Sequence, residues 1–201
     1  GEARDIFLFD NVDPDMPDML YGRFPVVKSW ESLEKHFSSH SPEFLLGVGG
    51  PHVRLSLCEK AVSLGGILCS VVSRHAMIGD LGVKIGSGVC ILSHATITID
   101  VEIGEGTLIN KSVIVSHDAR VGRYCEVSPG ARILGRTTIG DRTEIGANAI
   151  VLPDVVVGKD CRVGAGAVVT RDVPDGLTVV GVPAKPLQRI TSYQAAAPDG
   201  N

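Results

Sequence analysis

The feature that most constrains this fold is a six-residue repeat that runs from residue 85 to residue 169. Every sixth residue is Ile or Val for fifteen consecutive repeats, without one insertion. The column consists of Ile85, Ile91, Ile97, Ile103, Ile109, Val115, Val121, Val127, Ile133, Ile139, Ile145, Val151, Val157, Val163 and Val169. A small or β-branched side chain, such as Val83, Ala95 or Thr107, stands two residues before each of them. Side chains alternate between the two faces of a strand, so both columns are expected to point inward.

A second period of eighteen residues lies on top of the first. Gly follows the Ile or Val position at Gly86, Gly104, Gly122, Gly140 and Gly158, each eighteen residues from the next. Three hexads therefore make one turn, which predicts a three-sided parallel β-solenoid of five regular coils stacked about 4.8 Å apart. The hexad spacing does not fix the hand of the coil, and the crossover rule for parallel strands would favour a right-handed path.

The chain before the repeat has a different composition, because seven of the nine aromatic residues precede residue 45. Strands are expected over 5–10, 24–27, 44–48 and 67–72. Helices are expected from the N-cap Ser29 to about Phe37 and from Pro51 to about Leu64. These elements predict a small α/β unit over 1–72, a solenoid over 73–187 with an irregular first coil, and a flexible tail over 188–201.

Charge and cysteine content exclude several function classes. The formal net charge is −4, and no cluster of Lys and Arg offers a surface for nucleic acid or an anionic membrane. No apolar run approaches the roughly 18–20 residues of a membrane span, and the first residues lack the pattern of a secretory signal. The five cysteines form no CxxC pair, which favours reduced, buried thiols. We therefore expect a cytoplasmic protein.

The candidate for chemistry within the repeat is the pair His117-Asp118. A neutral imidazole can accept a proton at physiological pH, and a neighbouring carboxylate can orient the ring. Gly135 occupies the same corner one coil later, so its bare N–H could meet a developing oxyanion. The competing interpretation is a solvated His on an outer face with Asp118 as a turn residue.

A metal site is the other chemistry to weigh. His75, His94 and His117 are separated by 19 and 23 residues, which does not bring the three to one corner of the solenoid. His36, His40 and His52 belong to helices or loops of the first unit. The sequence therefore predicts no metal.

From about Asp5 to Leu187 the chain resembles the family of sialic-acid O-acetyltransferases and nucleotide-amino-sugar N-acetyltransferases. The matching segments are FLFDNVDP, GVGGPHVR, INKSVIVSHDARVG, SPGARILG and VGAGAVVTRDVPDGLTVVGVPAKPL. This resemblance implies a left-handed parallel β-helix preceded by a small Rossmann-like sugar-binding domain. It also implies homotrimers with acetyl-CoA in the groove between neighbouring β-helices. Residue 5 corresponds to the family's second strand, so the domain looks truncated and lacks the Gly-rich phosphate loop.

The resemblance also implies roles for individual residues. His117 matches the general base, and Asp118 matches the carboxylate that raises its basicity. Gly135, Ala147 and Ala165 match positions that contact the pantetheine arm or the acetyl group, and Glu126 stands where the family commonly has a His near the thioester. Positions that contact the acceptor are matched by Asp10, Asn11, Gly49 and Asn110. Gly49-Gly50 before a helix could also bind an anion.

The implied function is acetyl transfer from acetyl-CoA to a sugar, by direct attack without a covalent enzyme intermediate. The resemblance favours N-acetylation of a nucleotide-linked amino sugar in surface glycan biosynthesis. O-acetylation of sialic acid or another sugar is a second hypothesis. A non-catalytic β-solenoid scaffold, which would not consume acetyl-CoA, is a third.

Overall fold

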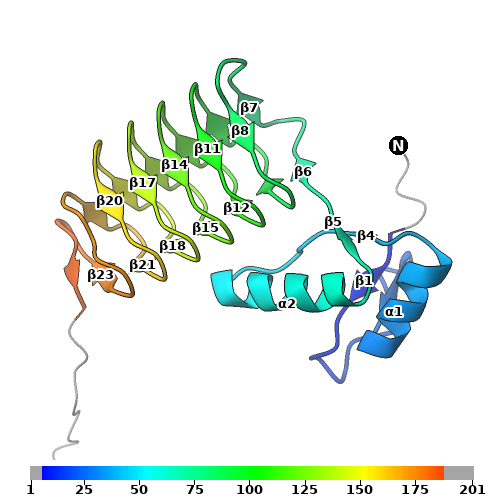
Figure 1. The fold of residues 1–201 in the computed structure, drawn as a ribbon. Coiled ribbons are helices and arrows are strands. Elements are labelled where there is room, and N and C mark those ends of the chain that lie inside the picture. The colour runs from blue at the N-terminus through cyan, green and yellow to red at the C-terminus, as the bar shows by residue number, and fades with distance from the viewer. Residues whose placement is uncertain (1–5, 188–201) are drawn as a thin grey trace, which may run out of the picture.

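The structure is a computed structural model that describes residues 6–187, in which a small α/β unit precedes a long three-sided β-helix (Figure 1). The predicted tail over 188–201 lies outside the described residues. The chain of the first unit runs into the β-helix, and the second helix of the unit extends beside the coils (Figure 1). The fold therefore places the two parts in contact along one side of the β-helix.

The first unit contains two helices and two small sheets. The helices are α1 (Trp30–Ser39) and α2 (Pro51–Ser63), and the strands are β1 (Leu8–Phe9), β2 (Met19–Leu20), β3 (Phe24–Val27), β4 (Glu43–Phe44) and β5 (Ile67–Leu68). β3 pairs parallel with β1 and antiparallel with β2, while β4 pairs parallel with β5. Leu33 and Phe37 of α1 pack with Ala61 of α2 to form a small core.

Most of the elements expected in this unit are present with small shifts. The Ser29 hydroxyl accepts the backbone N–H of Ser32 at 3.2 Å, as expected for the N-cap of α1. The strand predicted over 44–48 is wrong beyond Phe44, because the carbonyls of Leu46 and Val48 bond to the Arg54 side chain instead of a neighbouring strand. The strand predicted over 67–72 divides into β5 and β6 (Val71–Val72), and β6 pairs with a strand of the β-helix.

Three parallel sheets form the sides of the β-helix, as the eighteen-residue period predicts. Sheet I contains β6, β9 (Cys90–Ile91), β12 (Leu108–Ile109), β15 (Glu126–Val127), β18 (Glu144–Ile145), β21 (Arg162–Val163), β23 (Thr178–Val180) and β24 (Lys185–Pro186), of which only β24 is antiparallel. Sheet II contains β7 (Met77–Ile78), β10 (Thr96–Ile97), β13 (Ile114–Val115), β16 (Arg132–Ile133), β19 (Ile150–Val151) and β22 (Val168–Val169). Sheet III contains β8 (Lys84–Ile85), β11 (Glu102–Ile103), β14 (Arg120–Val121), β17 (Thr138–Ile139) and β20 (Val156–Val157).

The core of the β-helix consists of the two predicted columns. Neighbouring coils pair with a shift of eighteen residues, so that Val115 lies beside Ile133 and Ile133 beside Val151. Fourteen of the fifteen Ile and Val positions are buried, and the exception is Ile85, 36% exposed on the first strand of sheet III. Ile78 pairs with Ile97, one residue outside the period, which confirms the irregular first coil.

Each corner of the β-helix contains a residue in the left-handed region of backbone space. Asp100, Asp118, Arg136 and Asp154 adopt φ values between +54° and +66° at successive coils of the corner between sheets II and III. This conformation turns the chain sharply after each two-residue strand. Corner side chains therefore form vertical rows, and His117 lies in one of them.

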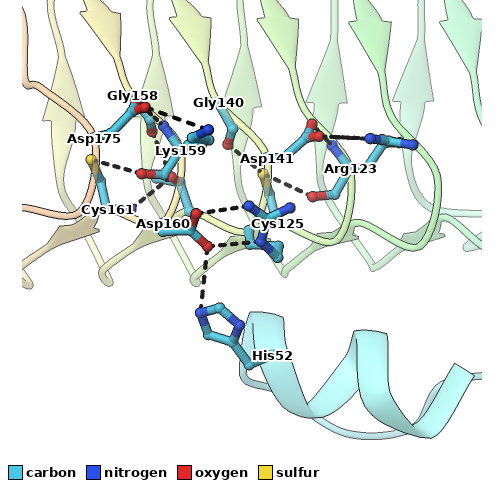
Figure 2. A network of polar contacts seen from close by, with 12 residues as sticks. His52, Arg123, Cys125, Gly140, Asp141, Gly158, Lys159, Asp160, Cys161 and Asp175 are labelled. Atoms are coloured by element: carbon cyan, nitrogen blue, oxygen red, sulfur yellow. Dashed lines mark hydrogen bonds and ion pairs between the residues drawn. The ribbon is translucent and has the colours of Figure 1, made fainter. Parts of the chain in front are cut away.

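Helix α2 joins the first unit to the corner between sheets III and I. The Arg54 side chain is fully buried there, and its Nε donates to the Gly106 carbonyl at 2.9 Å. The Tyr124 hydroxyl lies 3.5 Å from the Cys58 sulfur. His52 Nε2 lies 3.6 Å from Asp160 Oδ1, within a row of ion pairs along the same corner (Figure 2). These contacts connect one helix to three coils of the β-helix.

Candidate active site

His117 lies at the corner between β13 and β14, where its ring is half-exposed. Its Nδ1 is 2.7 Å from Asp118 Oδ2, the only hydrogen-bond partner of the ring among residues 6–187. Asp118 is also a turn residue with φ +59°, so the turn itself brings the carboxylate back to the preceding ring. With the proton on Nδ1, the Nε2 atom carries a lone pair and can act as a base.

Gly135 of the next coil lies directly against the His117 ring. A Cβ on Gly135 would stand 2.6 Å from His117 Cε1 and 2.7 Å from Nε2, so only glycine leaves the ring in this position. The Arg136 N–H donates to the His117 carbonyl at 2.9 Å and fixes the two corners to each other. Within the described chain, the Gly135 N–H donates to no acceptor and remains available for a ligand.

A pair of charged side chains lies further along the same corner. Arg136 forms two hydrogen bonds with Asp154, at 2.6 and 2.8 Å, and this pairing holds the pKa of Asp154 below its usual range, with a smaller contribution from His117. A surface depression of about 330 Å³ lies on the side of the preceding coils. It is lined by Gly82, Lys84, Asp100, Glu102, Asp118 and Arg120. A base, a bare peptide and a polar depression thus share one corner, an arrangement suited to removing a proton beside a reacting carbonyl.

Three of the other predicted site residues gather at a different corner, between sheets I and II. Ala147 and Ala165 lie one coil apart, and the Gly166 N–H donates to the Ala147 carbonyl at 2.8 Å. Asn110 lies at the same corner, where its side-chain oxygen accepts the Lys111 N–H at 3.0 Å. Within one chain, the structure therefore brings Gly135 to His117 but leaves Ala147, Ala165 and Asn110 at a separate corner.

The remaining predicted residues lie in or against the first unit. Asp10 accepts the N–H groups of Val12 and Asp13 at 2.8 and 3.1 Å, which lowers the pKa of its carboxyl group, and Asn11 is exposed next to it. Glu126 projects from β15, and its Oε2 accepts the Gly50 N–H at 2.6 Å. A Cβ on Gly49 would stand 3.0 Å from the same oxygen. The structure thus brings Gly49 to Glu126.

The sequence interpretation missed Arg54, the buried side chain that holds the loop before α2. Its Nη1 donates to the carbonyls of Leu46 and Val48 at 3.1 and 2.7 Å. The buried residues of α2 are Pro51, Arg54, Cys58 and Ala61, which lie on one face of a helix. The sequence signal that could have identified it is its spacing from Cys58 and Ala61, which places Arg54 on the apolar face of the helix.

The histidines of the β-helix lie at two different corners. The rings of His75 and His94 stack at 5.9 Å between centroids at the corner between sheets I and II, whereas His117 lies at the next corner. Between residues 6 and 187, no three His, Cys, Asp or Glu side chains gather as metal ligands would. Neither helix in that range is long and apolar enough to cross a membrane.

Comparisons with known proteins identify relatives of the whole fold. The family described as bacterial transferase hexapeptide (six repeats) matches residues 100–135 and 136–171. A perosamine N-acetyltransferase variant from Caulobacter crescentus, solved with CoA and GDP-perosamine, is 28% identical with a TM-score of 0.84, and the match covers 91% of this chain and 96% of that one. No curated protein sequence matches the chain.

Two further solved structures are more similar in sequence. The acetyltransferase domain of PglB from Neisseria gonorrhoeae is 32% identical over 90% of this chain and 86% of its own, with a TM-score of 0.80. WeeI from Acinetobacter baumannii is 30% identical over 89% of this chain and 84% of its own, with a TM-score of 0.79. These matches extend over both the α/β unit and the β-helix, which confirms the left-handed coil that the resemblance implied. The chain therefore belongs to the family of hexapeptide-repeat acetyltransferases.

Proposed function

We propose that this protein transfers the acetyl group of acetyl-CoA to the amino group of a nucleotide-linked amino sugar. The observation that carries the proposal is the His117-Asp118 pair held against the bare peptide of Gly135. Relatives that match nearly the whole chain support the substrate class, since one of them was solved with CoA and GDP-perosamine and another with acetyl-CoA. Surface glycan assembly in the cytoplasm is the setting that we propose for this reaction.

In the proposed mechanism, His117 acts as the general base. Its Nε2 accepts a proton from the sugar amine as the amine nitrogen attacks the thioester carbonyl. Asp118 accepts the Nδ1–H and stabilises the imidazolium that forms. The Gly135 N–H donates to the oxyanion of the tetrahedral intermediate, and collapse of the intermediate breaks the carbon–sulfur bond. The His117 imidazolium then gives its proton to the departing thiolate. The amide and the CoA thiol are the products.

We propose that the complete site forms between subunits of a homotrimer. Gly135 lies at one corner, whereas Ala147 and Ala165 lie at another, yet the resemblance assigns all three to acetyl-CoA. A cofactor between two copies can contact Gly135 of one copy and the two alanines of the next. The acceptor is then held by Asp10, Asn11 and Gly49 of the first unit together with Asn110. The family resemblance also predicts a contact of Glu126 with the cofactor.

Acetyl transfer by His117→Ala tests the proposal, with GDP-perosamine as the first acceptor. Loss of a general base is expected to lower kcat by roughly 10²-fold or more. His40→Ala, at an exposed position next to α1, is the control and should retain the parent rate. If His117→Ala remains folded and its rate falls only a few-fold, His117 is not the base.

Gly135→Ala sharpens the same test. The added methyl group displaces the His117 ring, so a loss of about 10-fold is expected, without a change in fold. Because both changes act through one ring, the double variant should be no slower than His117→Ala. A panel of free and nucleotide-linked sugars separates N-acetylation from O-acetylation, and absence of acetyl-CoA consumption with every acceptor would favour a scaffold.

A further inference from the structure

The loop between β4 and α2 has little structure of its own. Residues 46–50, here called the 46–50 loop, read Leu-Gly-Val-Gly-Gly. Gly47 has open space around the position of a Cβ, and Gly50 adopts φ +78°. A segment with three glycines loses much conformational entropy when it becomes ordered, so its shape must come from residues outside it.

Two charged side chains fix the conformation of the loop, one near each of its ends. Arg54 donates to the carbonyls of Leu46 and Val48 and, through Nε, to Gly106 of the β-helix. Glu126 on β15 accepts the N–H of Gly50 at 2.6 Å. The loop is therefore fixed to the β-helix at Gly106 and at Glu126, two points separated by 20 residues of chain, slightly more than one coil.

The Glu126 carboxylate also occupies the N-terminal end of α2. Gly50 is the N-cap of this helix but offers no side chain to cap it. A carboxylate at that end bonds a free N–H and is favoured by the helix dipole. The place where Gly49-Gly50 could receive an anion is thus filled by the protein itself.

We propose that Glu126 is a positioning residue for the acceptor, because it holds the 46–50 loop at a fixed place relative to the coils that carry His117. This inference rests on the proposed function, in which Gly49 contacts the sugar nucleotide. It assigns Glu126 to the acceptor side, whereas the family resemblance assigns this position to the acetyl-CoA side. The two roles predict different kinetic changes.

Glu144 provides a matched control. It lies beside Glu126 in the register of sheet I, one coil further along. Its carboxylate accepts from Arg162 Nε at 2.8 Å, and the structure gives it no contact with the 46–50 loop. Glu144→Gln therefore removes the same charge from the same sheet without releasing the loop.

The first measurement is hydrogen exchange of the whole 201-residue chain, which needs no substrate. In Glu126→Ala, amides of residues 47–54 should exchange at least 10-fold faster than in the wild type, while amides of β12 to β21 keep their rates. Glu126→Gln retains an acceptor oxygen and should give a smaller increase, and Glu144→Gln none. Equal exchange in the wild type and Glu126→Ala overturns the role of Glu126, whether or not the protein transfers acetyl groups.

The second measurement separates the two substrates kinetically. Glu126→Ala should raise the KM for the nucleotide-linked amino sugar at least 5-fold and leave the KM for acetyl-CoA within 2-fold of the wild type. Glu126→Gln should recover part of the loss, and Glu144→Gln should match the wild type. A rise in the KM for acetyl-CoA with an unchanged acceptor KM overturns the inference and supports the donor-side role. Absence of acetyl transfer by the wild type would refute the proposed function instead.

Discussion

The β-helix and the α/β unit reach a stable fold in opposite ways. In the β-helix, the same inward positions repeat at every coil, and side chains such as Ile133 and Val151 are completely buried by neighbours of the same kind. The first unit has only a few buried apolar residues, of which Leu33 and Phe37 retain 8% and 7% exposure. It depends on individual contacts with the β-helix, above all Arg54. The stability of the β-helix is therefore distributed over many equivalent core positions, whereas that of the first unit is concentrated in a few contacts.

The largest effect is expected from a charge in the inward column. Ile133→Asp would bury a carboxylate that has no partner, at a cost of about 3–5 kcal/mol. The loss should appear as a lower urea midpoint of the far-ultraviolet circular dichroism signal, which is dominated by the β-helix. Arg132→Asp changes the adjacent, exposed residue and should shift the midpoint far less. Equal shifts for the two variants would contradict the inward and outward alternation.

Arg54→Met is expected to destabilise mainly the first unit. The change leaves the carbonyls of Leu46, Val48 and Gly106 without their donor, at roughly 1–3 kcal/mol for each buried group that remains unpaired. Trp30 is the only tryptophan and lies in α1, so its fluorescence reports on the first unit. We expect the free energy of unfolding measured by Trp30 fluorescence to fall by about 3 kcal/mol. The free energy measured by circular dichroism should change little.

The exposed residue Arg171 gives the control for that experiment. Arg171→Met should change the free energy of unfolding by no more than about 0.5 kcal/mol in either transition. If Arg54→Met shifts both transitions equally, the two parts unfold as one cooperative unit. The contrast between distributed and concentrated stability would then be wrong.

The same contrast explains how much of the structure the sequence could predict. The six-residue pattern occurs fifteen times, and each occurrence predicts one strand of the β-helix. The position of His117 at a corner, with Gly135 one coil later, therefore followed from spacing alone. Helix α1 was predictable from its local signal, the Ser29 cap. The hand of the coil depends on steric details of the corners that spacing does not contain, and it came from the resemblance.

The sequence pattern could not predict the contacts that fix the α/β unit to the β-helix. The strand expected over 44–48 ends at Phe44 because Arg54, several residues later, takes the carbonyls that a neighbouring strand would have used. Glu126 and Gly50 are 76 residues apart, and neither has a local motif that indicates the other. Such pairs become visible only when the packing of α2 on the β-helix is known.

The smallest effect concerns Asp160, which belongs to the β-helix and also touches the first unit. Arg142 forms two hydrogen bonds with this carboxylate, both at 2.7 Å, and they lower the pKa of Asp160. Because the pKa is lower in the folded state, the stabilisation is present above about pH 4 and is lost as the pH falls through the folded value. Asp160 and Arg142 retain 31% and 26% exposure, so solvent screening limits the contribution to less than about 1 kcal/mol.

Asp160→Asn should therefore lower the free energy of unfolding by less than about 1 kcal/mol at pH 7, and the difference from the wild type should narrow at pH 3. Asp80→Asn, at an exposed position of the irregular first coil, should show neither effect. His52 lies 3.6 Å from the same carboxylate, so the Trp30 transition should move together with the circular dichroism transition. A shift confined to circular dichroism would mean that the His52 contact does not connect the two parts, and that other contacts, such as those of Arg54 and Glu126, hold the first unit in place.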